Sequence, residues 1–260
     1  MATIARPLTT SSFAKTMAIV VACIAVAWGL CVWAELSGAA VQLHHHTLYE
    51  SGRPLWISAL IMVGAWQVMT AAMMLPSSLA FIRMYAVAAG NAPDFPRALT
   101  LFLAAYFAVW TGFALAAFSG DMSLHHAVDT LPWLGAHPQV IPAFTLALAG
   151  IYQLTPLKDA CLKACRNPGM YLTRHYRRGV MNGLKLGLGH AAFCLGCCWA
   201  LMLVMFAAGV AHLAWMGVLA VVMLVEKAMP RGDRIVVPVG VTLLAMGAAA
   251  LFVPGAIPGL

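Results

Sequence analysis

The sequence is short of charge. Only 9% of its 260 residues are Asp, Glu, Lys or Arg, while 63% are hydrophobic. A soluble domain carries about 25% charged residues, so this chain could not cover itself with a solvated surface. A small-residue cleavage pattern is also missing after the first apolar run, Ala18–Ala34, so we expect that run to be retained as a membrane span. The composition excludes an ordinary soluble protein and predicts an all-α polytopic membrane protein.

Seven apolar stretches are long enough to cross a bilayer, which needs about 20 residues. They lie near residues 14–35, 56–75, 97–119, 141–157, 185–208, 212–229 and 235–253. Lys and Arg are nearly absent from alternate connections, where Arg53 is the exception among fifteen basic residues. The positive-inside rule makes the basic side cytoplasmic. We therefore expect a single integral domain over residues 1–260, with about seven transmembrane spans, the N-terminus inside and the C-terminus outside, in a bacterial inner (plasma) membrane. The net charge of +7 is a topology signal and does not indicate a nucleic-acid partner.

The fifth of these spans carries thiols on one face. Cys194, Cys197, Cys198 and Met205 fall within about 100° of one another on a helix, and His190 lies in the same arc. Thiolates select Cu(I), Zn(II) or iron–sulfur clusters. Adjacent residues point in different directions on a helix, so packing alone gives no reason for both Cys197 and Cys198. We predict that the three cysteines bind a soft metal, with His190 as a further candidate ligand.

A second pair of thiols, Cys161 and Cys165, follows the fourth span. Their spacing puts both sulfurs on one face of a helix. Lys158, Lys163 and Arg166 are close in sequence, and we expect these cations to favour the thiolate form of the pair. Cytoplasmic thiols are normally reduced, which favours a reactive or metal-binding pair over a structural disulfide. The pair shares one ion with the fifth span only if the end of the fourth span folds back into the bundle. Otherwise the two groups of cysteines form two successive sites.

The second span carries a stripe of methionines. Met69, Met73 and Met74 lie near its inner end, where Pro76 is expected to end or kink the helix. Thioethers bind Cu(I) and little else of biological abundance, so the stripe favours copper over zinc as the metal. Methionine also fills gaps between packed helices, and this is the alternative for an isolated stripe.

Histidines gather on the predicted outer side. His44, His45 and His46 lie in the first outer loop, and His125 and His126 lie in the second. Imidazole with carboxylate suits Cu(II), Zn(II) or Ni(II), so these loops are candidates for gathering metal from the periplasm. The alternative is that interfacial histidines serve solubility and packing.

Other residues of the fifth and sixth spans are predicted to be structural. Gly183, Gly187, Gly189 and Gly196 should let neighbouring helices approach closely, as small residues do in membrane bundles. Glu226 and Lys227 are expected at the membrane interface, where snorkelling makes charge inexpensive and the pair would anchor the sixth span.

The chain resembles a family of predicted metal-binding integral membrane proteins over roughly residues 60 to 235. The match is carried by four segments at these relative positions: AWQVMTAAMMLP, YQLTPLKDACLKACRNP, CLGCCWALM and EKAMP. One family member, encoded beside a bacterial tyrosinase, is regarded as a copper chaperone that supplies this enzyme. The resemblance implies copper handling here, by the cysteines and methionines within the shared motifs. The residues concerned are Cys161, Cys165, Cys194, Cys197, Cys198, Met69, Met73 and Met74. The histidine tracts lie outside these motifs.

These observations favour a membrane copper chaperone or transfer protein that supplies Cu(I) to a cuproenzyme. An enzymatic alternative is a membrane thiol–disulfide oxidoreductase that uses the two groups of cysteines. A metal transporter is a third reading, and a purely structural bundle is a fourth. The sequence leaves open the metal, the direction of transfer, the client protein and the oligomeric state.

Overall fold

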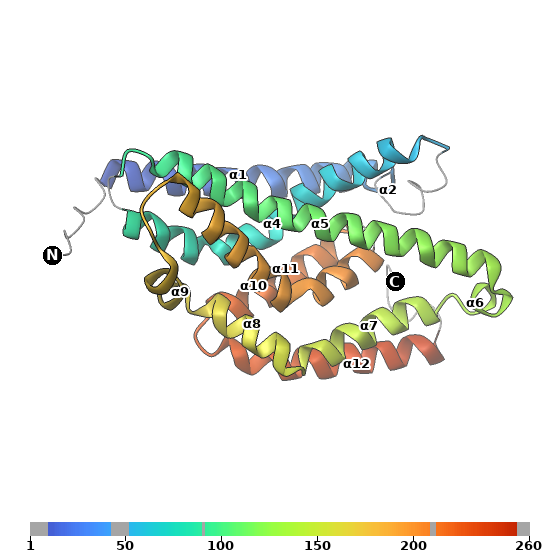
Figure 1. The fold of residues 1–260 in the computed structure, drawn as a ribbon. Coiled ribbons are helices and arrows are strands. Elements are labelled where there is room, and N and C mark those ends of the chain that lie inside the picture. Colours follow the sequence, from blue (N-terminus) through green and yellow to red (C-terminus); the bar gives the residue numbers. More distant parts are fainter. Residues whose placement is uncertain (1–9, 43–51, 90–91, 209–211, 254–260) are drawn as a thin grey trace.

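The computed structural model describes residues 10–42, 52–89, 92–208 and 212–253, and all regular structure in these ranges is helical (Figure 1). The elements are α1 (Thr10–Leu36), α2 (Ala39–Gln42), α4 (Leu55–Ala89), α5 (Phe95–Thr130), α6 (Pro132–Ala136), α7 (Val140–Gln153), α8 (Pro156–Arg166), α9 (Pro168–His175), α10 (Val180–Ala207), α11 (Leu213–Ala228), the 3-10 helix η1 (Gly232–Ile235) and α12 (Val236–Phe252). The all-α prediction is confirmed for the described residues, since helices make up all of their regular structure.

Five helical segments are long and apolar enough to cross a membrane. They are Phe13–Leu36, Leu55–Ala89, Phe95–Thr130, Val180–Ala207 and Gly232–Phe252. A sixth arises if α7 and α8, which are bent by 65° at their junction, count as one span. Helix α11 has only 16 residues. These helices are compatible with membrane insertion, while the full set of seven spans and the orientation of the termini stay predictions.

Helix α4 runs through Pro76 without a break, so of the two expected outcomes, an end or a kink, the first is wrong. A proline lacks the N–H that would bond the carbonyl four residues earlier, which here is that of Ala72. The indole Nε1 of Trp28 on α1 donates to this carbonyl at 2.9 Å. Because a neighbouring helix supplies the missing donor, α4 continues for more than three further turns to Ala89.

Helix α5 also extends beyond its predicted end. The segment expected to form the second outer loop is helical as far as Thr130. Within it, Nδ1 of His125 hydrogen-bonds the Asp121 carbonyl at 2.9 Å, and the Thr130 hydroxyl donates to the His126 carbonyl at 2.8 Å. His125 Nδ1 also lies 3.5 Å from the Asp121 carboxylate, and a four-residue side-chain pair of this kind supports the polar end of α5, which hydropathy alone could not reveal.

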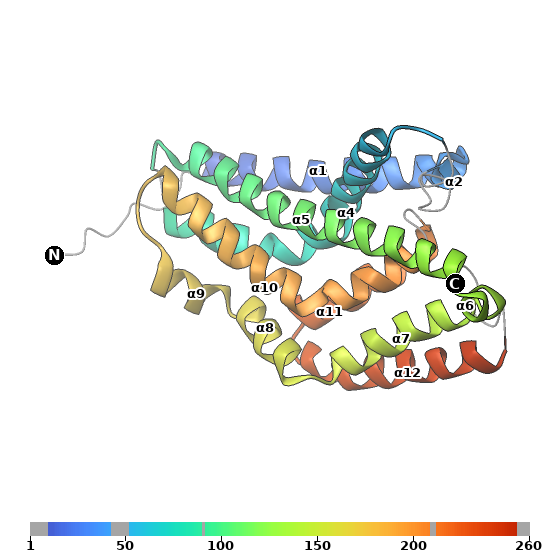
Figure 2. The ribbon, with the colours of Figure 1, turned by 45° about the vertical axis from the view of Figure 1, so that its right-hand side comes forward.

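Helix α10 is the central element of the bundle. In the most apolar 18-residue stretch of α10, 61% of the residues are buried, whereas in that of α1 only 22% are buried. It packs against α5, α7, α8 and α11, and Figure 2 shows it running between α5 and α8. A Cβ atom at Gly183 or Gly187 would overlap backbone atoms of α5. The prediction that small residues allow a close helix approach is therefore confirmed.

Gly187→Ala is expected to destabilise the fold. The added Cβ would lie on the Phe102 carbonyl oxygen and 2.9 Å from Cβ of Ala105, so α5 and α10 would have to separate. Overpacking of this kind costs about 1–3 kcal/mol. The matched control is Gly217→Ala in α11, where a Cβ meets nothing within 4 Å and the lower backbone entropy of alanine should preserve or raise stability. Thermal unfolding in detergent compares the two, and equal midpoints would contradict the α5–α10 packing.

Candidate metal centre

A bend between α7 and α8 returns the chain to the bundle. Thr155, between the two helices, has extended backbone (φ −81°, ψ 147°), and Pro156 occupies the first turn of α8. A residue before proline is forced out of the helical region, which ends α7. The Thr155 hydroxyl then caps α8 by accepting the Lys158 N–H at 3.3 Å. The resulting turn of 65° lays α8 against α10 and meets the condition for the two groups of cysteines to come together (Figure 1).

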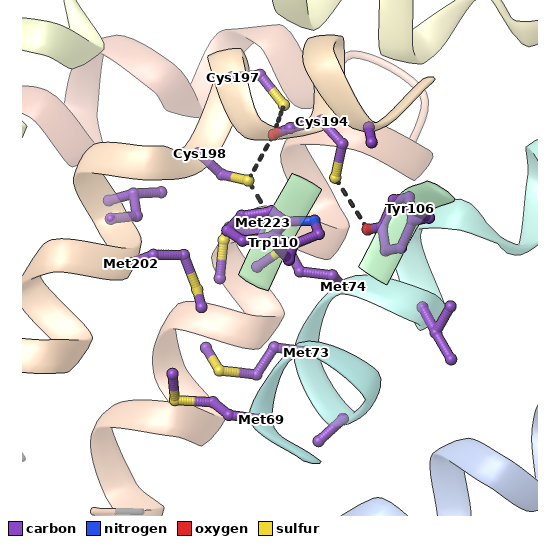
Figure 3. Close-up of a cluster of buried hydrophobic side chains, with 14 of the residues drawn as sticks. Met69, Met73, Met74, Tyr106, Trp110, Cys194, Cys197, Cys198, Met202 and Met223 are labelled. Atoms are coloured by element: carbon purple, nitrogen blue, oxygen red, sulfur yellow. Dashed lines mark hydrogen bonds between the residues drawn. The ribbon is translucent and has the colours of Figure 1, made fainter. Parts of the chain in front are cut away.

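The sulfurs lie on two sides of α10. Sγ of Cys165 on α8 is 3.7 Å from Sγ of Cys197, and Sγ of Cys198 is 3.6 Å from Sδ of Met74 on α4. The adjacent cysteines of α10 therefore point to different neighbours, and Figure 3 shows Cys198 directed toward Met74. Cys161 faces Gly196, where an added Cβ would lie only 2.6 Å from its sulfur. We call these groups the sulfur cluster: Cys161, Cys165, Cys194, Cys197, Cys198 and Met74.

The cluster is deeply placed. Cys194, Cys197 and Cys198 are each 1% exposed, whereas Cys161 and Cys165 are half-buried. Both Cys197 Sγ and Cys198 Sγ donate to the Cys194 carbonyl, at 3.2 and 2.8 Å. Among the described residues, no three His, Cys, Asp or Glu side chains already surround a point that could hold a metal ion. An ion would therefore be held by two thiolates with a thioether, or by thiols that move together around it.

A lysine ammonium lies within the cluster. Nζ of Lys227 is 3.2 Å from Sγ of Cys194 and 3.4 Å from Sγ of Cys198. It also lies 3.7 Å from Sδ of Met74 and 3.4 Å from the Ser77 hydroxyl. Lys227 is only 8% exposed, so the prediction that it anchors the helix at the interface is wrong. The end of α11 packs against α4 and α8, and this covers a residue that hydropathy places at the membrane surface.

Glu226 is buried as well, and Lys158 neutralises it. Lys158 Nζ lies 2.7 Å from a Glu226 carboxylate oxygen and donates to the Cys197 carbonyl at 3.0 Å. The amide of Gln153 donates to the other carboxylate oxygen at 2.7 Å. With exposures of 0% and 1%, the two charges stabilise each other away from solvent. The expectation of an interfacial Glu226 is wrong, and this pair instead ties α8 to α10 and α11.

The other cations near Cys161 and Cys165 do not contact their sulfurs. Lys163 is exposed and pairs with Asp159 on its own helix at 2.6 Å. Arg166 bonds the Glu226 backbone carbonyl and lies 3.4 Å from Asp233. The cation that reaches thiols of the cluster is therefore Lys227, which comes from a different helix than sequence proximity predicted.

His190 is connected to the cluster indirectly. Its Nε2 lies 3.1 Å from the Ser78 hydroxyl, which donates to the Tyr106 hydroxyl at 3.3 Å. The Tyr106 hydroxyl in turn lies 3.1 Å from Sγ of Cys194 (Figure 3). The imidazole packs on Phe81 with ring centroids 4.3 Å apart. The structure thus brings His190 to the cysteines through two hydroxyl groups and places aromatic rings around it.

The remaining predicted ligands lie in three places. Met69 and Met73 are buried on α4, at 1% and 0% exposure, and Figure 3 shows Met202 and Met223 between them and the cysteines. His125 and His126 lie near the C-terminal end of α5, at the opposite end of the bundle from α9. The tract His44, His45 and His46 lies outside the described residues.

Sequence reasoning missed Ser78 and Tyr106 and misplaced the Glu226–Lys227 pair. The pair did carry a signal, because ionisable residues at the end of an apolar helix are usually paired or functional. Ser78 and Tyr106 carried none, since their contacts depend on the register between α4, α5 and α10. Hydropathy reports one helix at a time and cannot set that register.

The comparisons with known proteins bear on these residues. A family model described as "PpoB2: Copper chaperone" matches residues 63–250. Searches of curated proteins and of solved structures found no match. The matched segment contains the whole sulfur cluster together with Lys158, Glu226 and Lys227.

Glu226→Gln is expected to destabilise the protein strongly. It leaves the Lys158 ammonium buried without its counter-charge, and breaking a buried pair costs about 3–5 kcal/mol. The double variant Lys158→Met/Glu226→Gln should recover much of this loss, because it removes the orphaned charge as well. Lys163→Met is the control for a surface pair and should have little effect. Unfolding in denaturant gives the free energies of the wild type and the variants, which form a double-mutant cycle. Losses of stability that simply add in the double variant would argue against an interaction between Lys158 and Glu226.

Proposed function

Because the chain belongs to the PpoB2 copper chaperone family, we propose that it is an integral membrane protein that holds Cu(I) on the sulfur cluster and supplies it to a cuproenzyme. The observation that carries the proposal is the meeting of α8 with α10, which puts Cys165 Sγ 3.7 Å from Cys197 Sγ inside an apolar bundle. Copper is the cargo, and the protein's role is binding and transfer rather than catalysis.

The donor set suits Cu(I). Thiolate and thioether ligands are soft and select Cu(I), whereas zinc gains nothing from a thioether. A metal–thiolate bond is about 2.3 Å in zinc sites, so two thiolates that share an ion lie within about 4.6 Å of each other. The Cys165–Cys197 separation of 3.7 Å is inside that limit. On the other side of α10, Met74 Sδ lies 3.6 Å from Cys198 Sγ and supplies a thioether. Zinc is the alternative metal for the thiols alone.

Buried methionines offer a route to the cluster. Met202 on α10 lies four residues beyond Cys198, and Met223 on α11 lies four residues before Lys227, about 6 Å along each helix. On α4, Met73 directly precedes Met74 and Met69 lies five residues before it, about 7.5 Å along the helix, and Figure 3 shows these thioethers together. Farther along the same helices, Met62 and Met216 are also buried, at 1% and 0% exposure. We infer that Cu(I) passes between these thioethers toward the cysteines.

The distribution of charge gives the route a direction. Basic residues lie at the end of the bundle that holds α8 and α9, whose last turns carry Lys163, Arg166, Arg174 and His175. With that end on the cytoplasmic side, seven spans of an inner membrane put the N-terminus inside and the C-terminus outside. His125 and His126, and the tract His44, His45 and His46, then face the periplasm and gather metal for the thioether route.

A thiol–disulfide oxidoreductase is the second candidate. Two thiols 3.7 Å apart can lose two electrons and two protons to an oxidant such as a quinone and form a disulfide between Cys165 and Cys197. A transporter is less favoured, because the buried carboxylate of Glu226 is neutralised by Lys158. Copper binding uses both groups of cysteines and the buried thioethers. A disulfide between Cys165 and Cys197 gives the thioethers no role.

Cys197→Ser/Cys198→Ser is expected to remove bound copper. The pair faces both neighbours of α10, so serine at both positions takes a thiolate from each side of the helix. Metal analysis after extraction in reductant, with Cu(I)–thiolate absorption in parallel, should show about one copper or more per wild-type chain and almost none in the variant. Cys23→Ser on α1, where the thiol is exposed, is the control and should keep its copper. Stoichiometric copper in the double variant would contradict the assignment of Cys197 and Cys198 as copper ligands.

Thiol alkylation followed by mass spectrometry separates the two candidates. Cu(I) loading should protect Cys161 and Cys165 from a permeable maleimide, and a Cu(I) chelator should restore their reactivity. These two thiols are half-buried, so the metal-free protein should react measurably. Protection that is reversed by a reductant, and not by the chelator, would mean a disulfide and would favour the oxidoreductase.

A further inference from the structure

The Lys227 ammonium shares its surroundings with the proposed Cu(I) ligands. Its Nζ contacts Sγ of Cys194 and of Cys198 on α10, and Sδ of Met74 and Oγ of Ser77 on α4, all within 3.2–3.7 Å. A lysine this deep in an apolar bundle needs a compensating negative charge. Among the described polar groups in contact with Nζ, only the two thiols can supply one.

The nearest acid does not compensate Lys227. The Glu226 carboxylate is held by Lys158 at 2.7 Å and by the Gln153 amide at 2.7 Å. The charges of Lys158 and Glu226 cancel, and the hydroxyls of Ser77 and Tyr106 that border the thiols are neutral. The charge on this side of α10 is therefore set by Lys227, the two thiols and whatever ion they bind.

We propose that Lys227 makes the Cys194–Cys198 site selective for a monovalent cation. This rests on the proposed function, and it adds a specificity-determining residue to it. Metal binding requires both thiols as thiolates, which contribute two negative charges. With one charge from Lys227 and one from Cu(I) the site is neutral, whereas a divalent ion leaves a net positive charge. Net charge in a buried site is strongly disfavoured, so Lys227 discriminates against Zn(II) although zinc accepts the same thiolates.

The lysine side chain can accommodate the bound ion. Because Nζ lies 3.2 and 3.4 Å from the two sulfurs, an ion bound to both of them would occupy the region that Nζ now fills. The four-carbon stem of lysine is flexible, and the Ser77 hydroxyl already lies 3.4 Å from Nζ on the α4 side. Lys227 thus withdraws toward Ser77 and remains the counter-ion of the copper–dithiolate group. In the metal-free protein the ammonium is the cation of the same site.

The test compares two soft ions that bind thiolates but differ in charge, Ag(I) and Cd(II). Purified full-length protein in a Cys161→Ser/Cys165→Ser background confines chelation to the α10–α4 side of the cluster. Affinities for both ions are measured by competition with a chelator, in the background protein that keeps Lys227 and in its Lys227→Met and Lys227→Gln variants. Removal of the ammonium should shift the Ag(I)/Cd(II) affinity ratio toward Cd(II) by at least tenfold. Lys227→Gln keeps a hydrogen-bond donor without the charge, and it serves if the methionine variant does not fold.

Two controls and three outcomes decide the matter. Lys227→Arg keeps the charge and should keep the wild-type ratio of affinities. Lys163→Met removes an exposed lysine and should also leave this ratio unchanged.

If Lys227 has only a structural role, its removal lowers the affinity for both ions together and leaves the ratio fixed. That result overturns the selectivity proposal, while Cu(I) binding by the wild type still stands. A wild-type protein whose thiols bind neither Cu(I) nor Ag(I) overturns both the proposed function and the role of Lys227. A shift toward Cd(II) in the uncharged variants alone supports the proposal.

Discussion

Burial of charge in an apolar bundle is the constraint on which the arrangement of α8, α10 and α11 depends. Lys158 and Glu226 are 0% and 1% exposed, and either alone would be costly at that depth. They meet at 2.7 Å, and the remaining bonds of each go to Gln153 and to the Cys197 carbonyl. One polar network therefore spans α7, α8, α10 and α11. It also orients α8 so that Cys165 reaches Cys197.

The same network explains why Lys227, the second buried lysine, contacts sulfur atoms. Since Lys158 occupies the carboxylate, the Lys227 ammonium lies among Cys194, Cys198, Met74 and Ser77. Soft sulfur donors that already surround one positive charge are suited to a monovalent soft cation. The proposed charge selectivity therefore builds on the copper cargo that the family of this chain suggests, and it adds a reason why that copper would be Cu(I).

Much of the fold could be predicted from hydropathy, because a membrane helix satisfies its backbone internally and its apolar residues are contiguous in sequence. The errors arose where another element intervened. Trp28 on α1 supplies the donor that lets α4 pass Pro76, and side-chain contacts such as that of His125 extend α5 beyond its apolar part. Close packing against α4 and α8 buries Lys227, which sequence position alone assigns to the interface.

The sequence by itself determined that the chain is all-helical, that its cysteines and methionines share helix faces, and that Cys197 and Cys198 point in different directions. These properties follow from helical geometry within a single segment. Only the tertiary structure decided that Cys165 meets Cys197, that Cys198 meets Met74, and that Lys227 rather than Lys158 reaches the thiols. These meetings depend on the bend at Thr155 and Pro156, on the close helix contacts at Gly183 and Gly187, and on the buried ion pair. Pro156 and the glycines are visible within single segments, but the partners that they bring together lie in other segments, so the sequence pattern does not reveal which residues meet.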